Sequence, residues 1–292
     1  MADSIDWPIK TREINDAYFE SARWNGFGFR DGDVVIAAYP KVGTNWTQQI
    51  AWQLAHGGPP GVDGLLNVAW LDLRIAPFKA IMDAYEAQTD RRIIKTHLPL
   101  EALVFSPKAK YLVLGRDARD MVWSAYNHQQ LNSDEVLALF NGPPGRPGAA
   151  VARPDRDIRD YYLHFLEHDD LPGFAFEPFW PHVRGWWTAR GLPNVLLVHY
   201  ANLKADLPRE IRRIARFLTI EIDEAALPAM VEHCRFDYMR AGANNHPNFN
   251  KGFNGRWKDV LSPAEMARCD EVALQNLTPD CAHWLASGEL PE

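Results

Sequence analysis

Short, nearly continuous hydrophobic runs alternate along the chain with segments whose apolar residues recur at helical spacing. The runs that predict strands are rich in β-branched residues or leucine and lie at Val34–Tyr39, Arg92–Thr96, Tyr111–Arg116 and Val195–Tyr200. Such continuous hydrophobicity is typical of strands buried on both faces of a parallel sheet. Helices are predicted between them, at about Asn45–Ala55, Asp120–Gln130, Trp180–Arg190 and Leu207–Leu218. The alternation predicts an α/β fold in which helices flank a central parallel sheet.

We expect a single domain that spans residues 1–292. One segment interrupts the alternation, because residues 141–148 read Asn-Gly-Pro-Pro-Gly-Arg-Pro-Gly. This density of proline and glycine predicts a loop. Core elements are predicted on both sides of it, so we interpret about residues 141–155 as a mobile insertion within the domain.

Composition and charge narrow the class of protein. The net charge of −7 disfavours a general binder of nucleic acids or membrane surfaces. The N-terminus lacks the basic and then apolar pattern of a signal peptide, and no apolar run is long enough to cross a bilayer. The three cysteines show no metal-ligand spacing and suit a reducing compartment. These features predict a cytoplasmic protein without a metal site, in which any anion site is a local cluster of cations.

The first candidate for such a site follows the strand at Val34–Tyr39. A loop with Lys41 and Gly43 leads from this strand into a helix that begins near Asn45. Helix N-termini present free N–H groups and partial positive charge, so the loop can hold a phosphate or a sulfate. The common nucleotide loop Gly-x-x-x-x-Gly-Lys-[Ser/Thr] is absent, because the lysine precedes the glycine. A solvated surface lysine is the competing interpretation.

A second candidate lies in Lys95-Thr-His-Leu-Pro99, directly after another predicted strand. His97 can accept a proton near neutral pH, and Lys95 is expected on the same face because side chains two apart in a strand share a face. A histidine at a strand end is more often structural when it stands alone. The neighbouring cation favours a base and a positive charge in one cleft.

Two further segments carry cations and hydroxyl groups. Arg116 ends a predicted strand, and Ser124 follows about two helical turns later. An arginine fork and a serine hydroxyl suit a phosphate, although an Arg–Asp surface network remains an alternative. Residues 250–258 read Asn-Lys-Gly-Phe-Asn-Gly-Arg-Trp-Lys, which suggests either an anion-binding flap or a flexible basic loop.

Together these segments resemble the cytosolic-type sulfotransferases, the family that uses 3′-phosphoadenosine-5′-phosphosulfate (PAPS). Residues 39–46 resemble the family's 5′-phosphosulfate loop, Tyr-Pro-Lys-Ser-Gly-Thr-Thr-Trp, and residues 95–99 match the segment that carries its catalytic histidine. The stretch from Arg116 to Ser124 resembles the 3′-phosphate strand and helix. Residues 250–258 resemble Arg-Lys-Gly-x-x-Gly-Asp-Trp-Lys. The similarity spans roughly residues 29–265, and several ordered motifs together are specific.

The resemblance implies sulfuryl transfer from PAPS to a small acceptor, with the catalytic residues His97, Lys41, Lys95 and Ser124 and no metal. The implied role of His97 is to take a proton from an acceptor hydroxyl or amine, while the two lysines stabilise negative charge. The cofactor-binding residues implied are Lys41, Gly43, Thr44, Asn45, Trp46, Arg116, Ser124, Tyr200, Phe236, Asn250, Lys251 and Gly252. An apolar or aromatic acceptor is implied to meet Phe27, Phe29, Phe78 and His97.

The chain departs from the family pattern at several positions. Asn250 stands where the family has an arginine on the 3′-phosphate, and Arg256 stands where it has an aspartate. The family's dimerisation segment is not matched, so monomer and homodimer both stay open. Two other functions also stay open: a non-catalytic protein that binds the nucleotide, and a small-molecule kinase, against which the absence of a P-loop sequence counts.

Overall fold

A computed structural model describes residues 5–56, 70–89, 91–242 and 252–291 of the chain. Its centre is a sheet of four parallel strands in the order β2-β1-β3-β4. The strands are β1 (Val34–Ala38), β2 (Ile93–Thr96), β3 (Lys110–Gly115) and β4 (Val195–His199). All five residues of β1 are buried, as expected for a central strand covered on both faces. The predicted α/β fold with a parallel sheet is confirmed, and each predicted strand lies within one residue of the observed bounds.

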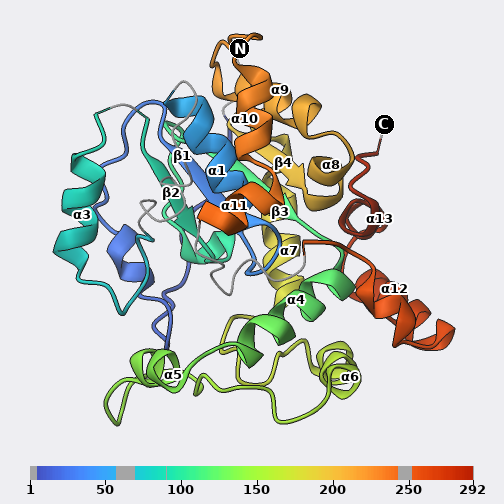
Figure 1. Cartoon of the computed structure of the whole chain (residues 1–292). Coiled ribbons are helices and arrows are strands. Elements are labelled where there is room, and N and C mark those ends of the chain that lie inside the picture. The colour runs from blue at the N-terminus through green and yellow to red at the C-terminus, as the bar shows by residue number, and fades with distance from the viewer. Residues whose placement is uncertain (1–4, 57–69, 90, 243–251, 292) are drawn as a thin grey trace.

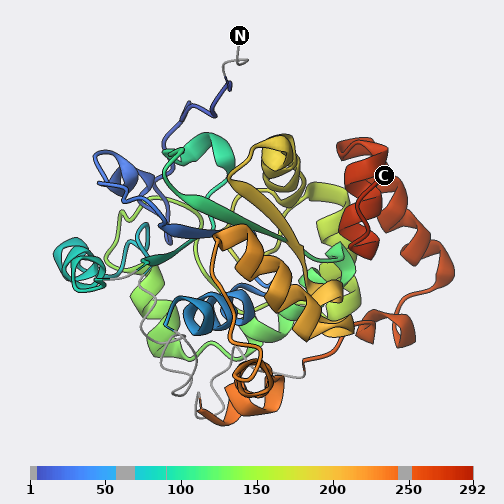
Figure 2. The ribbon, with the colours of Figure 1, turned by 90° about the horizontal axis from the view of Figure 1, so that it is seen from above.

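Helices cover both faces of the sheet. In Figure 2, α1 (Thr44–Ala55) and α9 (Leu207–Leu218) lie on one face and α7 (Phe179–Thr188) lies on the other. With α4 (Ala118–Gln130), these are the four helices that the hydrophobic pattern predicts, and their bounds agree within two residues. The remaining helices are α3 (Phe78–Glu86), α5 (Asp134–Asn141), α6 (Ile158–His168), α8 (Tyr200–Ala205), α10 (Leu227–His233), α11 (Phe236–Gly242), α12 (Pro263–Asn276) and α13 (Pro279–Ser287).

The strand order determines where a ligand can bind. The chain leaves β1 for β2 on one side and later returns to β3 on the other side, so the connections diverge between β1 and β3. Ligands in open α/β sheets bind outside the carboxyl ends of the strands at such a point. The loop with Lys41 and the residue Arg116 follow β1 and β3 directly, and the Arg116 Nη1 atom donates a hydrogen bond to the Lys41 carbonyl oxygen at 2.9 Å.

The proline- and glycine-rich segment is a loop, as predicted. It follows α5, which lies at the lower end of the molecule in Figure 1, and it contains no helix or strand from residue 142 to residue 157. Hydrogen bonds tie it to its surroundings: Asn141 Nδ2 donates to the Val151 carbonyl at 2.9 Å, and the Ala152 N–H donates to the Gly173 carbonyl at 2.9 Å. Its mobility stays a prediction.

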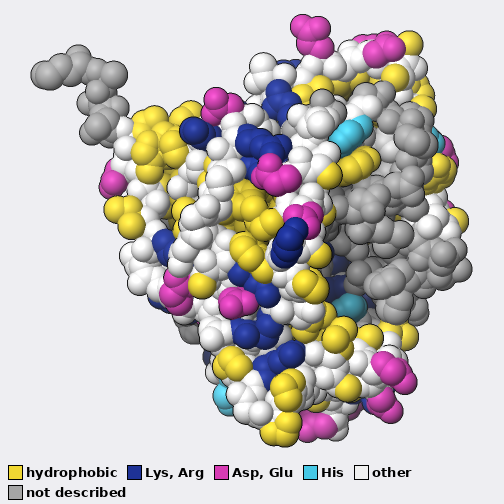
Figure 3. Space-filling view, turned by 90° about the vertical axis from the view of Figure 1, so that its left-hand side faces the viewer, with side chains coloured by type: hydrophobic (Ala, Val, Ile, Leu, Met, Phe, Trp, Pro, Cys, Tyr) yellow, Lys and Arg dark blue, Asp and Glu magenta, His cyan; other side chains and the backbone are white. Residues whose placement is uncertain are grey.

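One face of the molecule carries side chains of mixed chemical type. Figure 3 shows the face over α3, where basic, acidic and hydrophobic side chains are interspersed. The described side chains on that face do not form the continuous basic surface that a nucleic-acid backbone requires. Within the described ranges, no helix has the length and apolar character needed to cross a bilayer.

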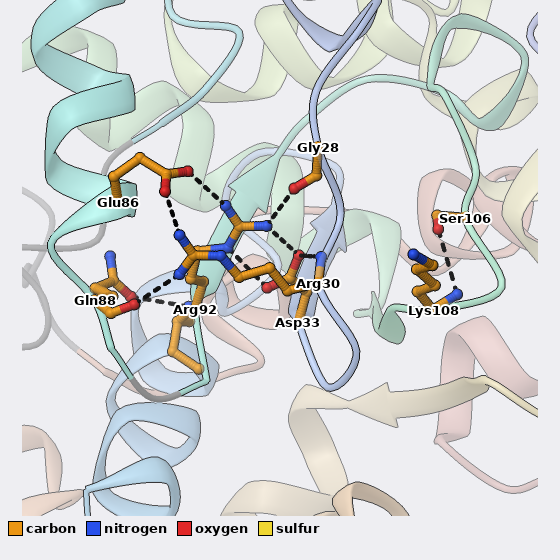
Figure 4. Close-up of polar contacts among 9 residues, drawn as sticks. Gly28, Arg30, Asp33, Glu86, Gln88, Arg92, Ser106 and Lys108 are labelled. Atoms are coloured by element: carbon orange, nitrogen blue, oxygen red, sulfur yellow. Dashed lines mark hydrogen bonds and ion pairs between the residues drawn. The ribbon is translucent and has the colours of Figure 1, made fainter.

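A buried ion pair supports the starts of β1 and β2 (Figure 4). Asp33 and Arg92 are both almost wholly buried. Arg92 donates from Nε to Asp33 Oδ1 at 2.9 Å and from Nη2 to Asp33 Oδ2 at 2.6 Å, and Nη2 also reaches the Gly28 carbonyl at 2.7 Å. Removing one partner of such a pair leaves an uncompensated charge in the interior.

We therefore expect Asp33→Ala to lower the free energy of unfolding by about 3–5 kcal/mol. Urea titrations followed by circular dichroism measure the change. The matched control is Asp31→Ala, which removes an exposed carboxylate from the same turn and should change stability by less than about 0.5 kcal/mol. Equal stability of the two variants would contradict the account of the buried pair.

Candidate active site

A cavity of about 1220 Å³ opens at the carboxyl ends of the strands, next to α1, α4, α8 and α11. It brings together every described residue that the sequence predicts as catalytic or cofactor-binding. These are Lys41, Gly43, Thr44, Asn45, Trp46, Lys95, His97, Arg116, Ser124, Tyr200, Phe236 and Gly252. The two remaining predicted residues, Asn250 and Lys251, lie outside the described residues.

The loop between β1 and α1 has an unusual backbone. Lys41 has a φ of 69°, which is rare for a residue with a side chain, and Gly43 has a φ of 115°. A Cβ atom on Gly43 would lie 3.0 Å from Tyr200 Cδ2, so glycine is required there both for conformation and for space. Strained backbone of this kind occurs at ligand sites. The Thr44 Oγ1 atom at the start of α1 is buried and has no hydrogen-bond partner within the described part of the chain.

Lys41 lies deep in this loop. Burial, with smaller contributions from the positive charges of Arg116 and Lys95, lowers the pKa of its ammonium group to about 7. Three cations, each partly or largely buried, therefore lie close enough at the wall of the cavity to affect one another. Such an arrangement is costly unless an anion binds there.

His97 follows the end of β2, and its ring orientation is fixed by the neighbouring strand. Its Nδ1 atom lies 2.7 Å from the Ala38 carbonyl oxygen. A carbonyl oxygen only accepts, so Nδ1 carries the proton and Nε2 keeps a free electron pair. Burial and, to a smaller extent, the charge of Lys95 together lower the pKa of His97 to about 3. His97 is thus a neutral imidazole at physiological pH, with Nε2 able to accept a proton.

Lys95 and His97 both line the cavity, as strand alternation predicts. The Lys95 ammonium lies 4.8 Å from the centre of the Trp70 ring, whose edge contact with the His97 ring has a centroid distance of 4.9 Å. Burial lowers the pKa of Lys95 to about 8. Trp70 therefore contacts both polar residues at this end of the cavity.

Asp72 is a buried carboxylate that the motifs do not predict. It accepts hydrogen bonds from Thr96 Oγ1 at 2.5 Å and from Trp24 Nε1 at 2.8 Å. Burial raises its pKa to about 6, although the nearby Lys95 favours the charged form. Side chains alternate along a strand, so Thr96 points to the opposite face of β2 from Lys95 and His97. The hydrogen bond from Thr96 therefore attaches Asp72 to the face of β2 that is turned away from these two residues.

Arg116 lies between the β1 loop and the segment that begins at Gly252. Its Nη1 atom donates to the Lys41 carbonyl, and its Nη2 atom donates to Asn254 Oδ1 at 2.7 Å. The guanidinium carbon lies 4.0 Å from the centre of the Tyr200 ring. Its Nε atom is buried and has no hydrogen-bond partner in the ranges that the structure describes. Ser124, on α4, lines the same region.

The predicted acceptor-binding phenylalanines do not line the cavity. Phe27 and Phe29 pack edge to face at 5.0 Å in the core, where Phe27 also covers the Arg92 guanidinium at 4.8 Å. Phe78 lies on α3 and is 42% exposed. Contact of these residues with an acceptor stays a prediction, because chain position alone does not report the direction of a side chain. Besides Trp46, Tyr200 and Phe236, the aromatic residues that line the cavity are Tyr18, Trp70, Phe140, Phe174, Phe176, Tyr238 and Phe253.

The described residues contain no group of three or more histidine, cysteine, aspartate or glutamate side chains that could hold a metal ion. The three cysteines, Cys234, Cys269 and Cys281, are all buried and unpaired. Burial raises the pKa of each thiol to about 12, so none is a reactive thiolate at physiological pH.

Comparison with known proteins identifies the class to which this site belongs. A family model described as the sulfotransferase domain matches residues 31–279. A glycolipid sulfotransferase of Mycobacterium tuberculosis is 30% identical over an alignment of length 306, gaps included. The alignment covers 92% of each chain. Sulfotransferase 2B1 of Rattus norvegicus is 29% identical over 85% of this chain and 72% of its own length.

Solved structures share the fold. Mouse sulfotransferase SULT7A1, crystallised with PAP (3′-phosphoadenosine-5′-phosphate), aligns with a TM-score of 0.69 and 19% identity over 91% of this chain and 92% of its own. Retinol dehydratase in a complex with retinol and PAP aligns with a TM-score of 0.66 and 22% identity over 89% and 85% of the two chains. The chain belongs to the sulfotransferase family and is a sulfotransferase enzyme of the PAPS-dependent class.

Proposed function

We propose that the protein transfers the sulfuryl group of PAPS to a hydroxyl or amine of a small apolar or aromatic acceptor, with His97 as the general base. The observation that carries this proposal is the position of His97. Its Nδ1–H is held by the Ala38 carbonyl, and its free Nε2 belongs to the same cavity as Lys41 and Lys95. A base, two cations and an aromatic wall in one cavity support transfer of an anionic group to a bound nucleophile.

The residues of the cavity fit the donor. The buried and unpartnered Thr44 Oγ1 and Arg116 Nε atoms are free to donate to phosphate oxygens in the described structure. We assign Lys41, Thr44 and Asn45 to the 5′-phosphosulfate, and Arg116 and Ser124 to the 3′-phosphate. The aromatic rings of Trp46, Tyr200 and Phe236 then enclose the adenine, with Gly43 and Gly252 allowing close approach of the backbone. When bound, PAPS supplies an activated sulfuryl group and a phosphate leaving group.

Three side chains have different roles in the proposed in-line transfer. His97 Nε2 takes the proton from the attacking group. Lys95 holds negative charge on the sulfuryl oxygens, and Lys41 stabilises charge on the leaving oxygen. In the nucleotide-free protein the pKa of His97 is lowered to about 3 by burial and by Lys95. A bound polyanion offsets the lysine charges, so the basicity of His97 increases when the donor is present.

The acceptor end of the cavity favours an apolar body. The Tyr18 ring stacks on Phe176 at 4.2 Å and contacts Phe140 at 4.5 Å. These rings lie in the same cavity as His97, whose ring is 6.1 Å from Phe176. A phenol or an apolar alcohol buries more hydrophobic surface there than a sugar does. Relatives named for glycolipids are compatible with an acceptor that has an apolar part. We propose a cytoplasmic enzyme; a homodimer and a monomer are both compatible with the cavity.

Two measurements test the proposed function. Calorimetric titration with PAP, beside ATP with and without Mg²⁺, tests the donor class. Mass-spectrometric assay with PAPS and 4-nitrophenol, n-hexanol or glucose tests the transfer and the acceptor class. We expect tight binding of PAP and sulfation of the first two acceptors. Binding of PAP without turnover of any acceptor would favour a non-catalytic nucleotide-binding protein, and Mg²⁺-dependent binding of ATP alone would favour a kinase.

A further inference from the structure

Arg256 places a second guanidinium, half-buried, at the end of the cavity that contains Arg116, Ser124 and Tyr200. It is the first residue of the 3-10 helix η4 (Arg256–Asp259). The sequence shows only that an arginine stands where relatives have an aspartate, and this substitution does not determine where the side chain points. In the structure, the side chain lines the cavity, whereas Lys258 on the same short helix is exposed.

Contacts on both sides of Arg256 hold it in this position. The Gly255 N–H donates to Asp120 Oδ1 at 2.7 Å, and Gly255 has a φ of 81° that favours glycine. On the other side, the Arg119 guanidinium covers the Trp257 ring at 4.7 Å. Both anchors belong to α4, the helix that carries Ser124. The backbone at Arg256 is therefore fixed against α4.

The same segment is tied to Arg116. Asn254 Oδ1 accepts the hydrogen bond from Arg116 Nη2. At the start of the segment, Lys204 Nζ donates to the Gly252 carbonyl at 3.2 Å. The residues on both sides of Arg256 are thus held by elements that line the cavity, and these contacts keep the two arginines at the same end of it.

The charges at this end of the cavity are not balanced within the described chain. Among the described residues, neither Arg116 nor Arg256 forms an ion pair with a carboxylate within 4 Å, whereas Arg119 is paired with Asp117 at 2.7 Å. Burial lowers the pKa of both guanidinium groups, and the charge of Arg116 lowers the pKa of Arg256 further. The Asp120 carboxylate is the acidic group nearby, and its Oδ1 atom accepts the Gly255 N–H. Two like charges held together in a cavity favour binding of an anion between them.

We propose that Arg256 is a donor-binding residue which, together with Arg116, clamps the 3′-phosphate of the nucleotide and makes the site selective for nucleotides that carry this group. This inference rests on the proposed function. It explains how a chain with asparagine at position 250 retains two arginines for the 3′-phosphate: the second fork comes from position 256 instead. A guanidinium in either place offers the bidentate geometry that a phosphate accepts.

Calorimetric titration of Arg256→Ala with PAP and with 5′-AMP, which lacks the 3′-phosphate, tests the proposal. We expect the dissociation constant for PAP to rise by about 10- to 100-fold and that for 5′-AMP to change by less than about twofold. Arg256→Lys should recover part of the loss, because it restores the charge without the fork. Lys258→Ala is the matched control, and it should leave both affinities unchanged.

A second readout separates a direct contact from a structural role. In the wild-type complex, ³¹P NMR should show the pKa of the 3′-phosphate of bound PAP lowered by two guanidinium groups, and this lowering should be smaller in Arg256→Ala. Equal losses for PAP and 5′-AMP, or a 3′-phosphate pKa that does not respond to the substitution, would overturn the clamp. If the wild-type protein does not bind PAP at all, the proposed function itself fails. If wild type and Arg256→Ala bind PAP equally well, this inference alone fails.

Discussion

We expect that His97→Ala lowers kcat for sulfuryl transfer by about 10²- to 10⁴-fold while the affinity for PAP stays within about threefold. The substitution removes the proton acceptor Nε2, whereas the loop of Lys41, Thr44 and Asn45 stays on β1 and α1. Single-turnover sulfation assays measure the chemical step, and calorimetry with PAP measures binding.

The variant His97→Gln distinguishes a base from a structural histidine. Glutamine can donate to the Ala38 carbonyl, as His97 Nδ1–H does at 2.7 Å, but it cannot accept a proton at neutral pH. Equal loss of turnover in the two variants, with PAP still bound, is the expected result. Recovery of activity in His97→Gln, or loss of PAP binding in both, would show that the histidine only supports the fold of the site.

The pH dependence of wild-type turnover offers a second check on His97. The neutral imidazole is the active form, so activity is lost as the pH falls through its pKa. The pKa of His97 is lowered to about 3 in the nucleotide-free protein by burial and by the lysine charges, and bound anions raise it. The pH profile of kcat reports the pKa of His97 in the complex, and that of kcat/KM reports its pKa in the free enzyme. We therefore expect kcat to fall at a higher pH than kcat/KM does when the pH is lowered.

The second large effect concerns Lys41. We expect Lys41→Met to lower kcat by about 10²- to 10³-fold, because the variant lacks the cation that stabilises charge on the leaving oxygen. It should also weaken PAP binding, since the loop loses its charge-assisted hydrogen bond. Lys41→Arg keeps a permanent charge and should retain part of the affinity. Unchanged turnover in Lys41→Met would exclude Lys41 from the site of charge development.

The lowered pKa of Lys41 gives this prediction a pH signature. In the nucleotide-free protein the pKa is about 7, mainly because of burial, and a bound anion raises it. The nucleotide favours the protonated form, so affinity for PAP is greatest below pH 7 and falls as the pH rises above 7. Binding near pH 8 should take up protons, which calorimetry in buffers of different ionisation enthalpy detects. Lys41→Met should remove the uptake that sets in as the pH rises through 7 and leave that of Lys95, whose pKa in the nucleotide-free protein is about 8.

The local pattern of hydrophobic residues and polar motifs is sufficient to predict the central sheet and most of the residues that we assign to the donor and to catalysis. Buried parallel strands read as continuous hydrophobic runs, so all four strands are predictable within one residue. The polar motifs come directly after those runs, and the carboxyl ends of parallel strands meet at one edge of the sheet. For that reason, the order of strands and motifs along the chain is enough to place Lys41, His97 and Arg116 in one cavity.

Only the tertiary structure decided which side chains face the cavity when their position depends on distant contacts. Phe27 and Phe78 are predicted to meet the acceptor, yet Phe27 packs on Arg92 in the core and Phe78 lies on the exposed side of α3. The backbone next to Arg256 is held by the hydrogen bond between Gly255 and Asp120, which lie 135 residues apart in the chain. The sequence by itself therefore determined the fold and the order of the motifs, because these follow from local periodicity and strand ends, and the resemblance of those motifs to a known family indicated the enzyme class. The aromatic residues that we propose to meet the acceptor, and the position of Arg256 at the cavity, arise from packing between remote segments, which local periodicity does not encode.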